Sequence, residues 1–102
     1  MPWHSVAPVA AIPAGDYAQV EVGSTVVAVF NVGGEFHAID DVCTHDGGGL
    51  AGGAVDGEVV ICPRHGARFC LRTGAALTPP AYEPVRTYPI RIVDGTVEIE
   101  AE

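Results

Sequence analysis

The sequence predicts an all-β protein with about eight to ten short strands. Three observations support this prediction. Short segments rich in Val, Ile, Thr and aromatic residues recur along the chain, and Gly-containing turn signals separate them. In addition, no stretch combines apolar residues three and four positions apart with the capping residues that mark a helix. We therefore expect antiparallel strands joined by tight turns.

The N-terminal part predicts an edge strand followed by a hairpin. Residues 3–9 are rich in strand formers but are interrupted by Pro8, and proline is confined to edge strands because it cannot donate to a ladder. Residues 17–22 alternate polar and apolar side chains, as a half-buried strand does. Gly23-Ser24 then predicts a turn into residues 25–30, a largely apolar run typical of a strand buried on both faces.

A second hairpin leads into a glycine-rich loop. Gly33-Gly34 predicts the turn, and residues 35–39 form the returning strand. Residues 40–53 hold five glycines and show no strand pattern, so we expect them to form a loop. Residues 54–61 predict a further hairpin, with a type I′ turn at Asp56-Gly57.

The C-terminal part predicts a short strand, an extended segment and a final hairpin. Residues 67–71 predict the strand, and Pro79-Pro80 and Pro84 stiffen the segment that follows, because proline fixes φ. Asp94-Gly95 predicts the turn of the final hairpin. The apolar residues of this hairpin alternate with polar ones, so one face should be buried and the other wet. They are Ile90, Ile92, Val97 and Ile99.

Composition limits what the chain can bind. With 102 residues, it should form one domain spanning residues 1–102. The formal charge is −8 and there is no Lys, so we expect no nucleic-acid partner, because no basic patch could neutralise a row of phosphates. Negative charge suits docking to a basic partner, although solubility alone would also account for it.

The sequence predicts a cytoplasmic protein that does not enter a membrane. Its first residues lack the charged region and apolar run of a signal peptide. No window approaches about 18 apolar residues, the length of a membrane span. Three cysteines leave one over if two pair, which is atypical of a secreted disulfide framework. We therefore expect the protein to occur in a reducing compartment, as a monomer.

Two short motifs carry the side chains of a metal site. Residues 43–45 read Cys-Thr-His and residues 62–65 read Cys-Pro-Arg-His. A structural zinc site usually takes pairs of like ligands. Here each motif supplies one Cys and one His, which is typical of a Rieske [2Fe–2S] cluster with thiolates on one iron and imidazoles on the other. We therefore favour one such cluster per chain over zinc. The candidate ligands are Cys43, His45, Cys62 and His65.

The sequence resembles the Rieske-type ferredoxins, the small electron carriers of bacterial ring-hydroxylating dioxygenase systems. The resemblance covers essentially the whole chain and is most specific at residues 43–45, at residues 62–66 and in the Pro79-Pro80 loop. It implies a Rieske fold, in which a cluster-binding subdomain, here about residues 41–82, is inserted in an antiparallel β-sandwich or barrel-like base. It also implies that the proline loop lies over the cluster and that the His ligands are at the exposed tip.

The same resemblance implies a low reduction potential. The high-potential respiratory relatives have a disulfide between the ligand loops, and a Ser and a Tyr hydroxyl bonded to the cluster and to a ligand sulfur. This chain has Gly48 and Arg64 at the disulfide positions, and Ala67 and Phe69 at the hydroxyl positions. Hydrogen bonds to the sulfurs tune the potential. Without these hydroxyls, we expect a potential near the lower end of the Rieske range of about −150 to +300 mV.

These features predict that the protein is a one-electron carrier and not an enzyme. Four protein ligands leave no iron with the open position that Lewis-acid catalysis needs. The resemblance implies electron transfer from a flavin-dependent ferredoxin reductase to a terminal, aromatic-ring-hydroxylating oxygenase. Two alternatives stay open: a small Rieske subunit of a nitrite-reductase-like complex, and a zinc-stapled binding module without a redox function.

Four further residues are interpreted more plainly. Cys70 is taken as a buried small hydrophobe and not as a redox thiol. His4 and His37 have no neighbouring Cys, so we interpret them as residues that do not bind metal. Asp46, next to the first His, is either a simple loop carboxylate, a group that tunes the imidazole, or part of an acidic docking face.

Overall fold

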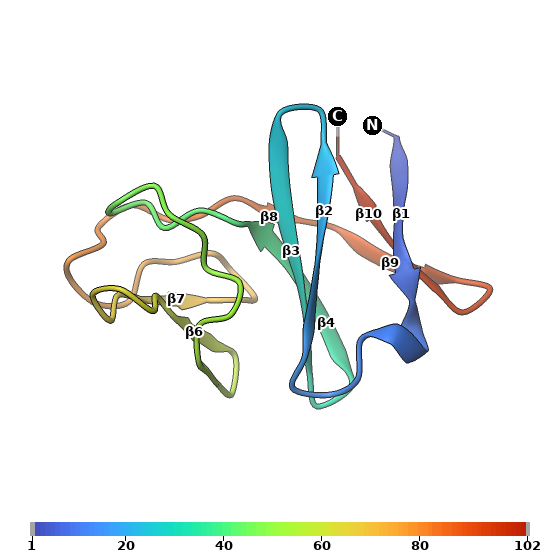
Figure 1. Ribbon diagram of the computed structural model, residues 1–102, viewed down its shortest axis with the longest axis horizontal. Helices are drawn as coiled ribbons and strands as arrows, with labels where there is room; N and C mark the ends of the chain where they lie inside the picture. The colour runs from blue at the N-terminus through green and yellow to red at the C-terminus, as the bar shows by residue number, and fades with distance from the viewer. Residues whose placement is uncertain (1, 102) are drawn as a thin grey trace.

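The computed structural model describes residues 2–101, in which ten strands form three antiparallel sheets (Figure 1). The same residues contain one short 3₁₀ turn. The all-β prediction is thereby confirmed. The same residues contain no helix long and apolar enough to cross a membrane. In chain order the elements are β1 (Trp3–Pro8), η1 (Val9–Ala11), β2 (Tyr17–Val22), β3 (Thr25–Val32), β4 (Glu35–Asp40), β5 (Val55–Asp56), β6 (Val59–Ile61), β7 (Arg68–Cys70), β8 (Thr87–Tyr88), β9 (Ile90–Val93) and β10 (Thr96–Glu100).

Two of the sheets form a sandwich, called the base below. One sheet has the strand order β1-β10-β9 and the other β2-β3-β4-β8. Their facing side chains enclose a first core, to which Val27 and Val29 contribute from β3 and Val97 and Ile99 from β10. The predicted edge strand is confirmed, because β1 lies at the edge of its sheet and ends at Pro8.

The third sheet, of order β5-β6-β7, lies beside the base and not on top of it (Figure 1). It belongs to the segment of residues 41–82, called the insertion below. The insertion has its own core, to which Leu50, Val60 and Phe69 contribute. Ala28 and Phe30 of β3 belong to this second core, while Val27 and Val29, which alternate with them, belong to the first. The prediction that this strand is buried on both faces is therefore confirmed.

Three local predictions need correction. Asp56 pairs with Val59, so the hairpin loop is Gly57-Glu58, and only Gly57 has a positive φ, of 59°. A type I′ turn needs positive φ at both central residues, so this turn is of another type. Ile92 of β9 is 51% exposed and does not share the buried face of β10. Finally, the proline-containing segment ends in the short strand β8, which pairs with β4 and which the sequence did not reveal.

Candidate metal centre

The two predicted motifs lie in loops with the same backbone hydrogen bonds. In each loop the cysteine N–H donates to the carbonyl five residues later, and the N–H four residues later donates back to the cysteine carbonyl, with N···O distances of 2.6–3.0 Å. The residue four positions after each cysteine is a glycine, Gly47 or Gly66, with φ of 77° and 76°. Side chains disfavour this left-handed region. The repeated Cys-x-x-x-Gly spacing is the sequence signal that could have predicted this equivalence.

The structure brings the two cysteines together and the two histidines together. Cys43 and Cys62 are 0% and 1% exposed, and their sulfurs and a carboxylate oxygen of Asp46 all lie within 4.8 Å of one another. His45 and His65 are exposed, and their ring centroids are 5.1 Å apart at an interplanar angle of 87°. Asp46 also lies within 4.8 Å of a nitrogen of each ring, so the sulfur pair and the imidazole pair adjoin.

This donor set fits a binuclear cluster. Burial raises the pKa of the Cys43 thiol, and the neighbouring Cys62 acts in the same direction, because an anion is poorly solvated beside the insertion core. A metal ion of high charge reverses this preference and holds thiolates. Two buried sulfurs on one side and two exposed imidazoles on the other match irons with different ligands.

The sequence interpretation missed an ion pair that joins the two loops. Arg64 donates from Nε to Asp46 Oδ2 at 2.6 Å and from Nη2 to Oδ1 at 3.0 Å. These bonds, together with the Gly48 N–H, hold the pKa of the Asp46 carboxyl well below its usual range. The guanidinium lies against Gly48, where an added Cβ would stand 2.5 Å from Cζ. Gly48 and Arg64 are thus neighbours linked through Asp46.

Two more contacts position the first loop. Asp41 Oδ1 accepts hydrogen bonds from the N–H groups of Leu50 and Ala51, at 2.6 and 2.8 Å. Thr44 donates from Oγ1 to the Glu83 carbonyl at 2.7 Å. The second contact holds the proline-containing segment against the first motif, next to the candidate ligands.

The remaining sequence candidates lie apart from this centre. Cys70 is half-buried, so the prediction of a buried residue was wrong, and a hydrogen bond from the Thr73 hydroxyl lowers its pKa. His4 Nε2 lies 3.0 Å from the Ala101 carbonyl oxygen, in keeping with a structural role. His37 lies 3.0 Å from a carboxylate oxygen of Glu35.

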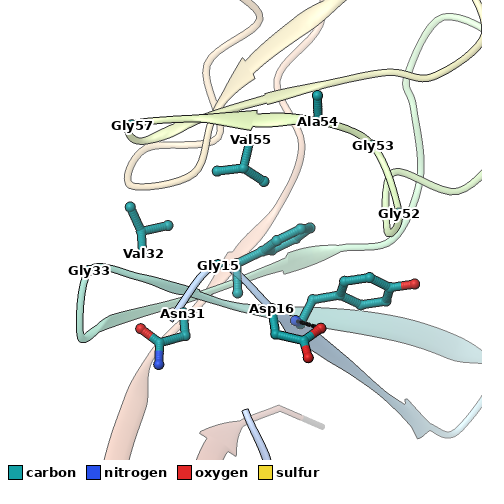
Figure 2. A pocket seen from close by; sticks show the side chains of 12 residues that line it. Gly15, Asp16, Asn31, Val32, Gly33, Gly52, Gly53, Ala54, Val55 and Gly57 are labelled. Carbon is teal, nitrogen blue, oxygen red and sulfur yellow. Dashed lines mark hydrogen bonds between the residues drawn. The ribbon is translucent and has the colours of Figure 1, made fainter. Parts of the chain in front are cut away.

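A hollow of about 430 Å³ lies between the base and the insertion (Figure 2). Figure 2 shows Val32 and Val55 pointing toward one another across it, with glycine backbone forming much of the remaining wall. Its one carboxylate, Asp16, accepts from the Tyr17 N–H at 2.8 Å. None of the four candidate ligands lines this hollow, so it is not part of the metal centre.

Comparison with known proteins agrees with the geometry. Residues 2–89 match the Rieske [2Fe-2S] domain family. The ferredoxin subunit of 3-phenylpropionate/cinnamic acid dioxygenase from Escherichia coli (strain K12) is 43% identical over 94 residues, which cover 91% of this chain and 88% of that one.

Solved structures extend the likeness to the whole fold. The Sphingomonas yanoikuyae B1 ferredoxin is 36% identical, with a TM-score of 0.91, over 99% of this chain and 100% of that one. A chain of the complex of reduced oxygenase and oxidized ferredoxin in carbazole 1,9a-dioxygenase is 33% identical, with a TM-score of 0.90, over 95% of this chain and 91% of that one.

Proposed function

The chain belongs to the Rieske [2Fe–2S] domain family, and on this premise we propose that Cys43 and Cys62 bind one iron of its cluster while His45 and His65 bind the other. The cofactor is one [2Fe–2S] cluster, so the zinc-stapled module is set aside. The observation that carries the assignment is the difference in burial between the two pairs. The sulfurs adjoin an apolar core and the imidazoles reach the surface.

The bound cluster would supply one-electron redox chemistry, and its ligands set the net charge of the centre that accepts the electron. Two ferric ions, two sulfides and two thiolates give a formally neutral oxidised centre, whereas four thiolates would leave two negative charges. A neutral centre is easier to reduce, which is why His₂ ligation raises the potential above that of about −400 mV for plant-type ferredoxins.

Within the Rieske range, we place the potential of this chain near the low end. Ala67 and Phe69 are both 0% exposed and carry no hydroxyl. Neither side chain can therefore donate a hydrogen bond to a cluster sulfur. Redox titration of the cluster-loaded protein tests this placement, and a clearly positive midpoint potential would contradict it.

The protein is an electron carrier of a dioxygenase system and not itself an enzyme. We place the cluster-binding subdomain at about residues 41–82, in a monomer of the cytoplasm. A flavin-dependent ferredoxin reductase supplies the electron, and a terminal oxygenase for an aromatic substrate receives it at the edge formed by His45 and His65. The His65 side chain is 58% exposed, which allows a partner to come close to a ligand of the cluster.

The relatives favour this role over a subunit of a nitrite-reductase-like complex. The curated relative at 43% identity is the ferredoxin subunit of a dioxygenase, and it matches nearly the whole chain. That enzyme system also suggests the first acceptor to try, the terminal oxygenase that acts on 3-phenylpropionate and cinnamic acid.

Stopped-flow mixing under anaerobic conditions tests the role. The reduced protein is mixed with the oxidised terminal oxygenase, and reoxidation of the carrier is followed by its visible absorbance. We expect one electron per chain to be transferred, with none from protein stripped of iron. Failure to reduce any terminal oxygenase, by a protein that carries an intact cluster, would contradict the role and leave the cluster assignment standing.

A further inference from the structure

A second cluster of metal-ligating side chains lies at the seam between the base and the insertion. Glu35 and His37 belong to β4 of the base, and Glu58 belongs to the β5–β6 turn of the insertion. One ligand atom from each of the three lies within 4.8 Å of the other two. The candidate cluster ligands take no part in this group.

His37 is the member that points to a ligand. Its side chain is only 10% exposed, and its Nε2 atom is buried without a hydrogen-bond partner within the described chain. Nε2 lies 3.0 Å from Glu35 Oε1, which is not aligned with the ring nitrogen for a hydrogen bond, and 3.8 Å from Glu58 Oε2, which is too far for one. A buried polar nitrogen without a partner costs free energy, so a partner is to be expected.

We propose that Glu35, His37 and Glu58 bind a divalent cation of the zinc class. Two ligand atoms each about 2.1 Å from one ion stand about 3.0 to 3.8 Å apart when the angle at the ion is about 90 to 130°. The two distances from His37 Nε2 match that range. One imidazole nitrogen and two carboxylate oxygens are ordinary zinc ligands, and a water molecule completes the coordination.

The cation that now faces these carboxylates is Arg72. Its Nε donates to Glu58 Oε2 at 3.0 Å, and Nη2 lies 3.5 Å from Glu35 Oε1. The guanidinium makes no contact of this kind with His37, whose Nε2 it leaves without a partner. Its side chain is 61% exposed and lines a hollow of about 480 Å³ that His37 also lines. Arg72 can therefore move out into solvent when a divalent ion enters.

The proposal makes opposite predictions for two neighbouring substitutions. His37→Gln removes the nitrogen ligand and should weaken zinc binding at least tenfold. Arg72→Ala removes a competing positive charge and should strengthen zinc binding by about two- to fivefold. The matched control is Arg91→Ala, because Arg91 pairs with Glu98 at 2.7 Å in the base without a histidine ligand nearby. This control should leave zinc binding unchanged.

Equilibrium dialysis of the cluster-loaded protein against zinc chloride tests the site, with zinc and iron counted by mass spectrometry. We expect one zinc ion per chain at unchanged iron content, and a higher melting temperature, because the ion joins the base to the insertion. Glu58→Gln serves as a second ligand variant if His37→Gln fails to fold. The iron count, which concerns the other centre, shows separately whether the redox cluster is present.

Three results would overturn the proposal. They are no zinc on the natural chain, equal binding by the natural chain and the ligand variants, and binding that appears only after Arg72→Ala. In the last case the guanidinium of Arg72, and not a metal ion, would occupy the site in the natural protein.

Discussion

The two kinds of candidate ligand differ in burial, and this difference is the main result at the scale of single residues. Cys43 and Cys62 are buried in the core of the insertion, and burial raises the pKa of the Cys43 thiol, a preference that a bound metal ion reverses. His45 and His65, the other two proposed ligands, are exposed, so they can form the solvent-facing side of the centre. An electron can then leave through the imidazoles without exposing the sulfurs.

Replacement of one imidazole by a thiolate should lower the reduction potential. In His45→Cys, a third thiolate adds negative charge to the centre, which makes reduction harder. We expect the midpoint to fall by on the order of 100 mV, toward the value of about −400 mV for all-cysteine ferredoxins. Redox titration of the reconstituted variant measures this shift. An unchanged midpoint would mean that His45 is not a ligand.

The Asp46–Arg64 pair should slow the loss of the cluster. Asp46→Asn keeps the size of the side chain but removes the charge that holds the guanidinium between the loops. We expect iron release to a chelator to become several-fold faster, and added salt to have the same effect on the natural protein because it screens exposed pairs. The control is Glu98→Gln, which removes a comparable Arg pair in the base. Equal rates in all three proteins would rule out this role.

At the scale of elements, the two ligand loops are equivalent structures at the same end of the insertion. Each is closed by the same two hydrogen bonds and contains a glycine at positive φ. The cysteine begins each loop, while the histidine lies two residues later in one and three residues later in the other. The loops thus present both sulfurs inward from a fixed backbone.

A pair of glycine substitutions separates backbone strain from the loss of the centre. Gly66 and Gly57 both have positive φ, of 76° and 59°, and an added Cβ would meet no atom within 4 Å at either position. Alanine should therefore cost a similar amount of stability in both, about 1 kcal/mol. Of these two variants, only Gly66→Ala should also lower the iron content, because Gly66 closes a ligand loop and Gly57 does not. Equal iron contents would show that the loop tolerates the change.

The pairing of β8 with β4 should weaken at high pH. Tyr88 of β8 donates its hydroxyl hydrogen to Asp40 of β4, and burial together with that carboxylate raises its pKa to about 12 from 10.0. The folded state holds this proton more tightly than the unfolded state does. The resulting stability is complete below pH 10 and is lost as the pH rises toward 12.

Urea unfolding at several pH values tests this dependence. The free energy of unfolding should fall between pH 10 and 12, and Tyr88→Phe should show a smaller fall over the same interval. Tyr82→Phe is the matched control, since Tyr82 is 80% exposed. If the natural protein and Tyr88→Phe lose stability equally, the hydroxyl of Tyr88 does not link pH to folding.

At the scale of the whole molecule, the base supports the fold and the insertion carries the candidate cluster ligands. The base has one core and the insertion another, and β3 contributes to both from its opposite faces. The candidate cluster ligands lie in the insertion. Glu35 and His37 of the base lie next to Glu58 of the insertion at the seam between the two parts. Charge is unevenly distributed as well, because Arg64, Arg68 and Arg72 all belong to the insertion of a chain whose formal charge is −8.

Sequence patterns reveal what depends on near neighbours and miss what depends on distant ones. Most strands, most turns and the choice of four candidate ligands were accessible from the sequence, because each depends on a few consecutive residues. The Asp46–Arg64 pair joins residues 18 positions apart, and β8 becomes a strand only by pairing with β4. Glu35 is close to His37 in the sequence, but Glu58, the second carboxylate beside it, comes from the turn between β5 and β6 and could not be foreseen.

Pulsed EPR on reduced protein that carries ¹⁵N-labelled histidine tests the ligand assignment most directly. The account predicts two irons and two sulfides per chain, and one unpaired electron coupled to two histidine nitrogens. One of these couplings should disappear in His45→Cys and one in His65→Cys, whereas His4→Gln should keep both. Two unchanged couplings in the first two variants, or bound zinc with no EPR signal, would contradict the assignment.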